Sequence, residues 1–385
     1  NTIRIYETDS HARRMKARVL SCEEGENGWL VELDRTIFYP TGGGQPCDTG
    51  TLGGADVTET LLRGETVLHR CTAALPAGAD VTGEIDWARR LDLMQQHSGE
   101  HLVSGLIHAR FGYENVGFHL GADLVTIDFN GEVDEQALQE LERAANEAVW
   151  ADFAPHIWYP EPDELAHLPY RSKKALTGAV RLVQFGDIDL CACCGTHVAR
   201  TGEIGLIKLF STTHFRGGSR IEMACGGRAL AVLNALCAQN RDISVRLSAK
   251  PVQTAAAVAR LASERTEAQQ RAAALEDRLF ALLAQDGQTL RFEPPMPPES
   301  VRRLADAMVR ANEARSAVFA GQDGAWHYAM ADPSGDLRGL VKRLNAALQG
   351  RGGGKPGFVQ GSLAASRTDI EAFFTAESCS MPDPA

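Results

Sequence analysis

Two short segments that carry potential metal ligands, far apart in the chain, impose the strongest constraint on the fold. His97 and His101 are four residues apart in a stretch of helical periodicity, so both imidazoles leave the same face of one helix. Cys193 and His197 repeat this spacing, and Gly195 between them permits a turn. Three imidazoles and one thiolate form a typical tetrahedral zinc set. The sequence therefore predicts a fold that brings both segments to one zinc ion.

The second segment contains more than one candidate thiolate. Cys191 and Cys194 lie close to Cys193, and spacing alone does not distinguish the three. The nine cysteines of the chain are odd in number and mostly scattered, unlike those of a secreted disulfide scaffold. The first ten residues lack the basic and apolar regions of a secretory signal. We therefore expect a cytoplasmic protein whose cysteine cluster serves metal or thiol chemistry.

The pattern of apolar residues divides the chain into four segments. Residues 1–88 combine short β patterns with glycine and proline, and they favour a small β-barrel. Residues 89–235 mix helical and strand patterns, residues 236–290 are helical, and residues 291–385 mix both again. The expected fold class is α+β and multidomain, with an N-terminal β-barrel, an α+β domain, a coiled-coil-like spacer and a C-terminal α/β module. No apolar run is long enough to span a membrane.

The spacer and the last module carry two further patterns. Between Val258 and Leu282, small or apolar residues recur at alternating steps of three and four, and only Arg265 interrupts them. This spacing predicts a helix whose seam pairs either within one chain or between two. In the last module, residues 349–357 are rich in glycine and are expected to form a loop.

A run of three glycines follows a predicted strand near residue 40. Gly42, Gly43 and Gly44 do not match a nucleotide-binding motif, because neither the glycine spacing nor a following lysine fits. The simplest interpretation is a hairpin turn. The functional interpretation is that a ligand lies against the backbone N–H groups, with Thr36 and Gln45 nearby as hydrogen-bonding side chains.

The first ligand pair also matches a peptidase motif. His97-Ser-Gly-Glu-His101 has the order of the inverted zinc-peptidase signature, in which Glu100 would be the general base. Such an enzyme takes a downstream acidic ligand, whereas this chain already offers a Cys/His pair. Glu100 is therefore either a catalytic base or a surface carboxylate, and a zinc-dependent peptidase remains an alternative function.

Six motifs stand in an order that points to one family. They lie at residues 38–50, 94–104, 116–121, 193–198, 218–222 and 352–362. The first five resemble the AlaX-type alanyl-tRNA editing proteins, which are relatives of the editing domain of alanyl-tRNA synthetase. The last resembles the C-terminal DHHA1 module of that synthetase, as in the long AlaX form. The resemblance covers nearly the whole chain.

The resemblance implies a reaction and its zinc ligands. The family motifs H-x-x-x-H and C-x-x-x-H map onto His97, His101, Cys193 and His197, which selects Cys193 as the thiolate. The implied reaction is hydrolysis of the ester between a wrong amino acid, serine or glycine, and tRNA(Ala). No aminoacylation domain precedes the motifs, so charging of tRNA is not expected.

The resemblance also implies substrate contacts and shows two departures. Thr36 matches a family position associated with serine recognition, and Gln45 with the glycine backbone would orient water or the aminoacyl group. His119 and Arg220 are expected in the substrate pocket, and a position in the protein core is the alternative for His119. Cys194 stands where the family usually has glycine, and Ser98 stands where it usually has threonine. The Cys194 departure keeps open an activity on another aminoacyl ester or a related small molecule.

The charge distribution bears on the RNA partner. A net charge of −11 argues against a protein that coats nucleic acid indiscriminately. Three stretches without acidic residues nevertheless concentrate positive charge, at 338–367, at 171–181 and between Glu203 and Glu222. The expected RNA contacts are Arg338, Lys342, Arg343, Arg351 and Lys355. The predicted partner is mischarged tRNA(Ala), with a homodimer through the spacer or last module; a non-catalytic tRNA-binding protein with structural zinc is an alternative.

Overall fold

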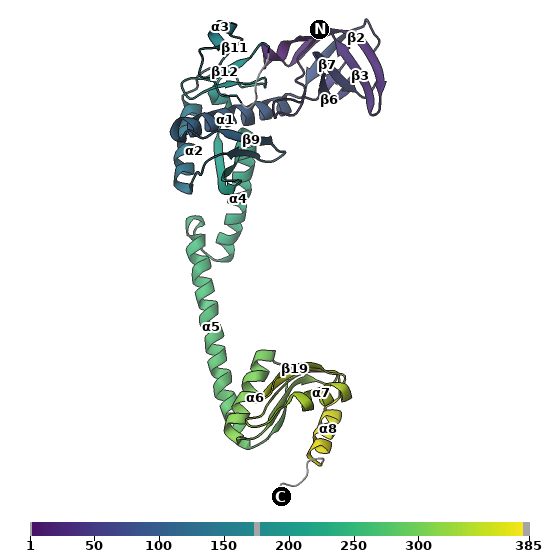
Figure 1. The fold of residues 1–385 in the computed structure, drawn as a ribbon, viewed down its shortest axis with the longest axis vertical. Helices are drawn as coiled ribbons and strands as arrows, with labels where there is room; N and C mark the ends of the chain where they lie inside the picture. Colours follow the sequence, from purple (N-terminus) through teal and green to yellow (C-terminus); the bar gives the residue numbers. More distant parts are fainter. Residues whose placement is uncertain (1, 173–177, 380–385) are drawn as a thin grey trace. The chain divides into compact units, whose positions relative to one another are not determined.

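The computed structural model describes residues 2–172 and 178–379, and the chain divides into two compact units. The first unit spans Asn1–Asp242 and the second spans Ile243–Ala385. The first unit contains helices and several separate sheets, and the second contains helices and one five-stranded sheet, so the mixed α+β, multidomain class is confirmed (Figure 1). The division into four segments remains a prediction. Among the described residues, no helix combines the length and apolar character that crossing a membrane requires.

Six antiparallel strands of the first unit form a closed barrel, because β8 pairs with both β5 and β2. Side chains along β2 alternate between exposed and buried, and Met15, Ala17 and Val19 face the barrel core. In spatial order the strands are β2 (Arg14–Gly25), β3 (Gly28–Leu33), β7 (Thr66–Cys71), β6 (Ala55–Arg63), β5 (Gly50–Leu52) and β8 (Asp80–Ile85). Beside the barrel, β1 (Ile3–Arg4), which is followed by the short helix η1 (Ile5–Glu7), pairs with β4 (Arg35–Thr36).

The rest of the first unit packs helices against two small antiparallel sheets. Helix α1 (Trp87–Phe111) begins at the N-cap Asp86 and ends at Gly112, which adopts a left-handed conformation. Helix α2 (Glu135–Trp150) is capped by Asp134, whose side chain accepts from the backbone N–H of Ala137. The first sheet has the strand order β14 (Ile207–Phe215), β15 (Gly218–Cys225), β10 (Val125–Phe129) and β9 (Asn115–Leu120). The second has the order β11 (His156–Trp158), β12 (Leu182–Phe185) and β13 (Asp189–Ala192). Short helices α3 (Pro162–Leu165) and η2 (Thr201–Ile204) complete this part.

A buried ion pair joins α1 to the segment that carries the glycine run. Arg90 of α1 and Asp48 are both inaccessible to solvent, and the Arg90 guanidinium donates to both carboxylate oxygens. Arg90 also donates to the carbonyl of Ile37, and the backbone N–H of Tyr39 donates to Asp48. A buried charge that keeps its partner and its hydrogen bonds is tolerated, whereas one left alone is costly. The pair therefore fixes the glycine run relative to α1.

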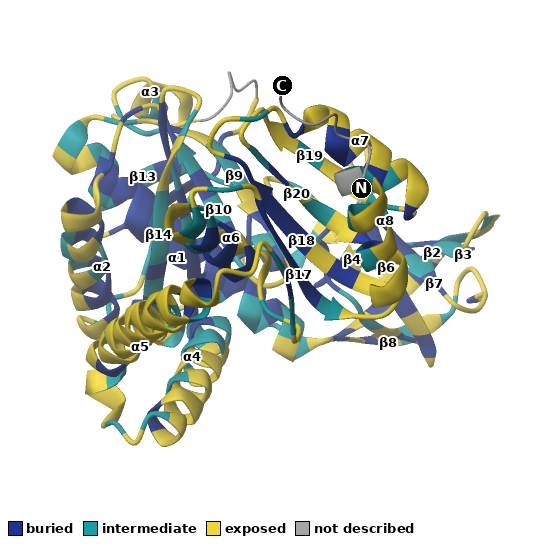
Figure 2. Ribbon diagram, turned by 90° about the horizontal axis from the view of Figure 1, so that it is seen from below, coloured by how far each residue is buried: buried dark blue, intermediate teal, exposed yellow. Residues whose placement is uncertain are grey.

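Helices α4 (Gly226–Arg246) and α5 (Thr254–Leu283) follow, with the short helix η3 (Pro251–Gln253) between them. Most of α5 is exposed, as the yellow colouring in Figure 2 shows. At its C-terminal end, Phe280 is buried against α6 (Pro298–Asn312). The apolar seam lies on other positions and is exposed at Val258, Leu261, Leu275, Leu279 and Leu282. The predicted helix is thus present, and its seam is uncovered in the described part of the chain.

A five-stranded sheet forms the core of the second unit. Its order is β16 (Leu290–Glu293), β17 (Ser316–Gln322), β18 (Ala325–Ala331), β20 (Phe358–Leu363) and β19 (Arg351–Lys355), with η4 (Ala284–Asp286), α7 (Arg338–Ala347) and α8 (Arg367–Cys379) beside it. The predicted glycine-rich loop at residues 349–357 is wrong for most of its length, because Arg351–Lys355 pairs with β20 as an edge strand. Glycine weakens a strand but does not prevent it where the neighbouring backbone supplies the hydrogen bonds.

Candidate metal centre

The four predicted ligands come together in one cluster. Helix α1 supplies His97 and His101, and the loop after β13 supplies Cys193 and His197. Their ligand atoms all lie within 4.8 Å of one another. The Cys193 Sγ atom is 3.5 Å from His97 Nε2 and 3.4 Å from His197 Nε2. The three histidines are buried and Cys193 is half-buried, so the donor set and its spacing fit a tetrahedral zinc ion.

Electrostatics distinguish the three neighbouring cysteines. Burial alone would raise the pKa of the Cys193 thiol, but the charges of His97 and His197 and hydrogen bonds from the histidines hold this pKa well below its usual value. Burial raises the pKa of Cys191 to about 11 and also raises the pKa of the exposed Cys194. A metal binds the thiolate form. Geometry and charge therefore favour Cys193 over its two neighbours.

Each histidine of the cluster has an outer partner at Nδ1, which leaves Nε2 facing the cluster. His97 Nδ1 donates to Gln45 Oε1 at 2.9 Å, and His101 Nδ1 donates to Asp189 Oδ2 at 2.7 Å. His197 Nδ1 lies 3.2 Å from Ser98 Oγ. Such partners fix the tautomer and the orientation of metal-binding imidazoles. Although burial would lower the pKa of His101, its hydrogen bonds to Asp189 and Cys193 raise it well above its usual value.

Gln45 lies behind a ligand instead of in front of the cluster. Its side chain is buried, Oε1 accepts from His97 and from the backbone N–H of Thr196, and Nε2 donates to the Thr196 hydroxyl. Both polar atoms of the carboxamide are therefore engaged with protein. The structure supports a positioning role for Gln45 and gives no contact that supports its predicted catalytic role.

The glycine run forms a hairpin turn next to the cluster. Gly42 and Gln45 exchange two backbone hydrogen bonds, and Gly43 and Gly44 have positive φ angles. The ring of Phe118 stacks on His97 with centroids 5.5 Å apart, and an added side-chain carbon at Gly44 would collide with that ring. The turn tip is exposed. The hairpin interpretation is thus confirmed, and only Gly43 and Gly44 remain as backbone candidates for substrate contact.

Thr36 lies on β4, beside the barrel, and its hydrogen bonds with described residues do not involve the cluster. Its hydroxyl accepts from the backbone N–H of Phe38 and lies 2.7 Å from His69 Nε2. Burial lowers the pKa of His69 to about 4, and its Nδ1 lies 3.0 Å from the carbonyl of Val31. His69 is therefore neutral with its proton on Nδ1, so the Thr36 hydroxyl donates to Nε2. The Thr36 hydroxyl could therefore donate a hydrogen bond to a substrate only if its bond to His69 were exchanged.

Glu100 is buried, so the interpretation as a surface carboxylate is wrong. Its Oε1 accepts from the Ser104 hydroxyl and from the Asn115 side-chain amide. Glu100 is not a member of the cluster of ligand atoms. This environment gives no support to a role as general base, and it does not favour the peptidase alternative.

The other two predicted pocket residues lie on the neighbouring sheet. His119 is exposed on β9. Arg220 on β15 forms two hydrogen bonds to Asp128 on the adjacent strand, and its guanidinium lies 3.8 Å from the centre of the Phe215 ring. The structure does not bring either residue into the metal cluster. Their predicted contact with the substrate remains a proposal.

Both arginines of the basic stretch at 171–181 bind partners inside the protein. Arg171 forms an ion pair with the buried Asp189. Arg181 is buried and donates to the carbonyls of Cys193 and Gly195, which holds the ligand loop. The two lysines of this stretch fall within residues 173–177, outside the described residues. The expectation that this stretch tracks RNA phosphates is therefore wrong for both arginines.

The predicted RNA contacts of the second unit fall into two classes. Arg338 is paired with Asp336 and Arg343 with Glu377. The others, Lys342, Arg351 and Lys355, are exposed and form no ion pair with any described residue. Arg351 and Lys355 flank the three glycines of the edge strand β19.

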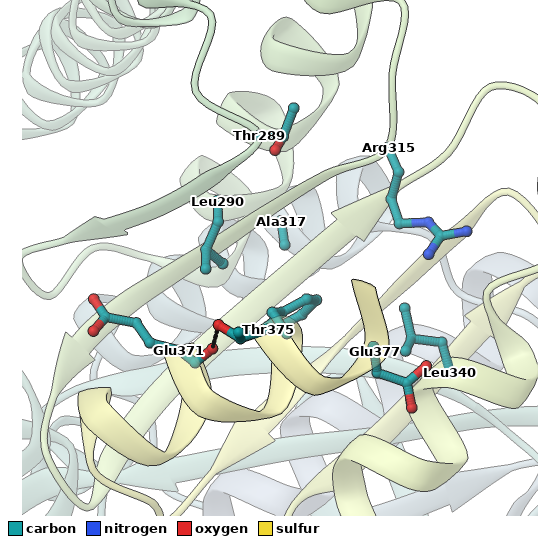
Figure 3. A pocket seen from close by; sticks show the side chains of 9 residues that line it. Thr289, Leu290, Arg315, Ala317, Leu340, Glu371, Thr375 and Glu377 are labelled. Carbon is teal, nitrogen blue, oxygen red and sulfur yellow. Dashed lines mark hydrogen bonds between the residues drawn. The ribbon is translucent and has the colours of Figure 1, made fainter. Parts of the chain in front are cut away.

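The cavity in Figure 3 lies in the second unit and is separate from the metal centre. Its volume is about 400 Å³, and residues of β17 and α8 contribute to its lining. Its charged side chains already have partners, in the pairs Arg315–Asp332, Glu371–Arg367 and Glu377–Arg343. The cavity therefore carries no functional assignment.

Sequence reasoning missed four residues that shape the centre. They are Ser98, Phe118, Asp189 and Thr196, which contact the ligands or their outer partners. All four lie inside or within four residues of motifs that carry the family resemblance, and this proximity is the only sequence signal for them. Their chemistry becomes visible only when the distant segments are brought together.

Comparisons with known proteins find similarity to tRNA synthetases and to alanyl-tRNA editing proteins. Residues 180–222 match the family model "Threonyl and Alanyl tRNA synthetase second additional domain", and residues 5–89 match "tRNA synthetases class II (A)". The chain is 32% identical over 241 residues to "Alanyl-tRNA editing protein AlaX-L" of Pyrococcus horikoshii, covering 60% of each chain. It is 26% identical over 391 residues to "Alanyl-tRNA editing protein Aarsd1" of Danio rerio, covering 94% of this chain and 95% of that one.

This chain is similar to alanyl-tRNA editing proteins of the AlaX type. The relationship extends to the synthetases, since the chain is 30% identical over 388 residues to "Alanine--tRNA ligase" of Methanoculleus marisnigri. That alignment covers 94% of this chain and 41% of the ligase. The chain thus spans 60% of the AlaX-L relative and nearly all of the Aarsd1 relative.

Proposed function

We propose that this chain is a trans-editing hydrolase that deacylates mischarged tRNA(Ala), with serine as the main misplaced amino acid and glycine as a second. The observation that carries the proposal is the convergence of four metal-ligand atoms within 4.8 Å, in a chain related to alanyl-tRNA editing proteins. Serine has one hydroxyl more than alanine. The hydrophobic pocket in which a synthetase charges tRNA with alanine rejects that hydroxyl poorly, so a separate hydrolytic site is needed.

The proposed cofactor is zinc, held by His97, His101, Cys193 and His197. When bound, zinc would supply positive charge that polarises the ester carbonyl or positions the acylated end of the RNA. A set of four protein ligands favours the positioning role. The chain itself supplies the exposed backbone of Gly43 and Gly44 beside the cluster.

A panel of aminoacyl-tRNA substrates tests the proposal. Seryl-, glycyl- and alanyl-tRNA(Ala) are incubated with the protein, with and without a zinc chelator, and the remaining ester is counted. We expect seryl-tRNA(Ala) to be hydrolysed fastest, glycyl-tRNA(Ala) next, and alanyl-tRNA(Ala) to stay largely intact. The chelator should slow hydrolysis and added zinc should restore it. An intact seryl ester would indicate a non-catalytic binder, and hydrolysis of peptides without tRNA would favour the peptidase.

The proposed role of Thr36 predicts a change in specificity. Thr36→Val should lower the preference for seryl- over alanyl-tRNA(Ala) at least about tenfold, because one hydrogen bond contributes about 1.4 kcal/mol. The matched control is Thr60→Val, which removes a second buried hydroxyl of the N-terminal region, the one that donates to the carbonyl of Asp48. Rates with both tRNAs give the preference directly. An equal change in both variants would mean that the effect comes from barrel stability and would reject the role in recognition.

The exposed basic residues of the second unit are proposed to contact RNA phosphates. The double substitution Arg351→Ala/Lys355→Ala should weaken tRNA binding. It should also make the slope of log affinity against log salt concentration shallower by about 1.5, because each lost phosphate contact reduces that slope by about 0.7 to 0.9. The matched control is Arg338→Ala/Arg343→Ala, whose guanidinium groups are already paired with carboxylates. The control should change the slope less. An unaltered slope in the first variant would contradict the assignment.

A homodimer remains part of the proposal. The uncovered apolar seam of α5, with five large side chains exposed, supports pairing between two copies. The cytoplasmic location is likewise proposed.

A further inference from the structure

We propose that Asp189, held by Arg171, is a positioning residue that sets the affinity of the centre for its metal through His101. This inference rests on the proposed function insofar as that function includes a bound metal. It assigns a role to two residues that sequence reasoning gave to RNA contact or to none.

The first observation is how the two carboxylate oxygens of Asp189 are shared. The side chain is completely buried. Oδ2 accepts from His101 Nδ1 at 2.7 Å, while Oδ1 accepts from Arg171 Nε at 2.8 Å and from the terminal guanidinium nitrogen at 2.6 Å. Each oxygen thus has its own partner, and the arginine fixes the carboxylate in the orientation that His101 requires.

The second observation is that the backbone holds Arg171 in register with β13. The Arg171 N–H donates to the carbonyl of Leu190, and the Ala192 N–H donates to the carbonyl of Arg171. Arg171 therefore forms a parallel bridge opposite Cys191. A side chain anchored at both its backbone and its guanidinium has little freedom, so it is a rigid support for Asp189.

The third observation is the close approach of α1 to the start of β13. Gly105 lies one turn beyond His101 on α1, and a side-chain carbon built there would lie 2.7 Å from Asp189 Cβ and would also collide with the carbonyl of Ile188. Only glycine permits this approach, which lets the short aspartate side chain reach His101. The same glycine has no other evident role in the helix, where it lowers stability relative to alanine.

Of the three outer partners, Asp189 is expected to affect metal binding most, because it alone is charged. Gln45 and Ser98 offer His97 and His197 neutral oxygen atoms, whereas Asp189 offers His101 an anionic one. A carboxylate behind an imidazole raises its basicity as a ligand, and removing such a partner typically weakens metal binding 10- to 100-fold. Asp189→Asn leaves one oxygen for two donor groups, so either His101 or Arg171 loses its acceptor.

The test measures metal binding directly. Zinc affinity of the full chain is determined by competition with a coloured chelator, and the visible spectrum is recorded with cobalt in place of zinc. For Asp189→Asn we expect zinc affinity to fall about 10- to 100-fold and the cobalt bands to shift, with the circular dichroism unchanged. The matched control is Asp187→Asn, the same chemical change on an exposed residue two positions away, which should bind zinc like the unmodified chain.

Each outcome decides the inference. Zinc affinity of Asp189→Asn within twofold of the unmodified chain would overturn it and leave the proposed function intact. An unmodified chain that takes up neither zinc nor cobalt would overturn both. If Asp189→Asn does not fold, Gly105→Ala decides the matter, since it keeps every charge and ligand while separating α1 from Asp189. Unchanged affinity in Gly105→Ala would then reject the role, and a loss of affinity with retained secondary structure would support it.

Discussion

Cys193→Ser is expected to remove nearly all zinc from the protein and to slow hydrolysis of seryl-tRNA(Ala) by at least about 100-fold. Loss of an outer partner of a ligand already costs 10- to 100-fold in affinity or activity, so loss of the ligand itself should cost more. The serine hydroxyl cannot replace the thiolate, because a hydroxyl is far less acidic than a thiol and stays neutral, whereas the surroundings of Cys193 hold the pKa of its thiol well below its usual value. Metal content by elemental analysis and the deacylation rate are measured on the same preparation.

The matched control for this substitution is Cys237→Ser, which changes an exposed cysteine on α4. It should retain full metal content and activity. If Cys193→Ser kept its zinc, the ligand assignment would be wrong and Cys191 or Cys194 would have to be tested in its place. If it lost zinc but still hydrolysed seryl-tRNA(Ala) at the original rate, the metal would have no part in the reaction.

Gly195→Ala is expected to weaken zinc binding although it removes no functional group. An added side-chain carbon would lie 2.5 Å from His97 Nδ1 and 3.0 Å from Gln45 Oε1, inside the hydrogen bond between them. His97 must then turn or shift, and the ligand geometry is lost. We expect zinc affinity and seryl-tRNA(Ala) hydrolysis to fall by at least about tenfold, the lower range for a lost outer partner.

Gly227→Ala provides the control, since an added carbon there meets no neighbouring atom within 4 Å and the residue lies in α4. Alanine in a helix is intrinsically favourable, so this variant should be at least as stable as the unmodified chain and fully active. Normal zinc affinity in Gly195→Ala would show that the packing around His97 is looser than the structure indicates.

Local patterns predicted the helices well. The helical periodicity around His97 and His101 and the helical pattern of residues 236–290 are confirmed by α1, α4 and α5. These signals succeed because the hydrogen bonds and caps of a helix join residues close in sequence. The ligand pairs were predictable for the same reason, since a four-residue spacing fixes neighbouring side chains within each segment.

Long-range packing set the limit of sequence reasoning. Nothing near Arg171 in the sequence indicates that it will be paired with Asp189, and nothing near Glu100 indicates burial against Asn115. Charged residues are usually exposed, so Arg171 was assigned to RNA contact, and Glu100 to the surface or to a role as catalytic base. The strand Arg351–Lys355 was missed because its stability comes from β20 and not from its own glycines.

The contacts of Gln45 and Asp48 with α1 have a practical consequence for shortened versions of this protein. Residues 87–242 contain all four ligands, yet Gln45 and Asp48, which support His97 and Arg90, lie outside that range. A fragment beginning at α1 would leave a buried guanidinium without its counter-ion and an imidazole without its acceptor. Minimal versions are therefore better trimmed from the C-terminal side, keeping the first compact unit whole.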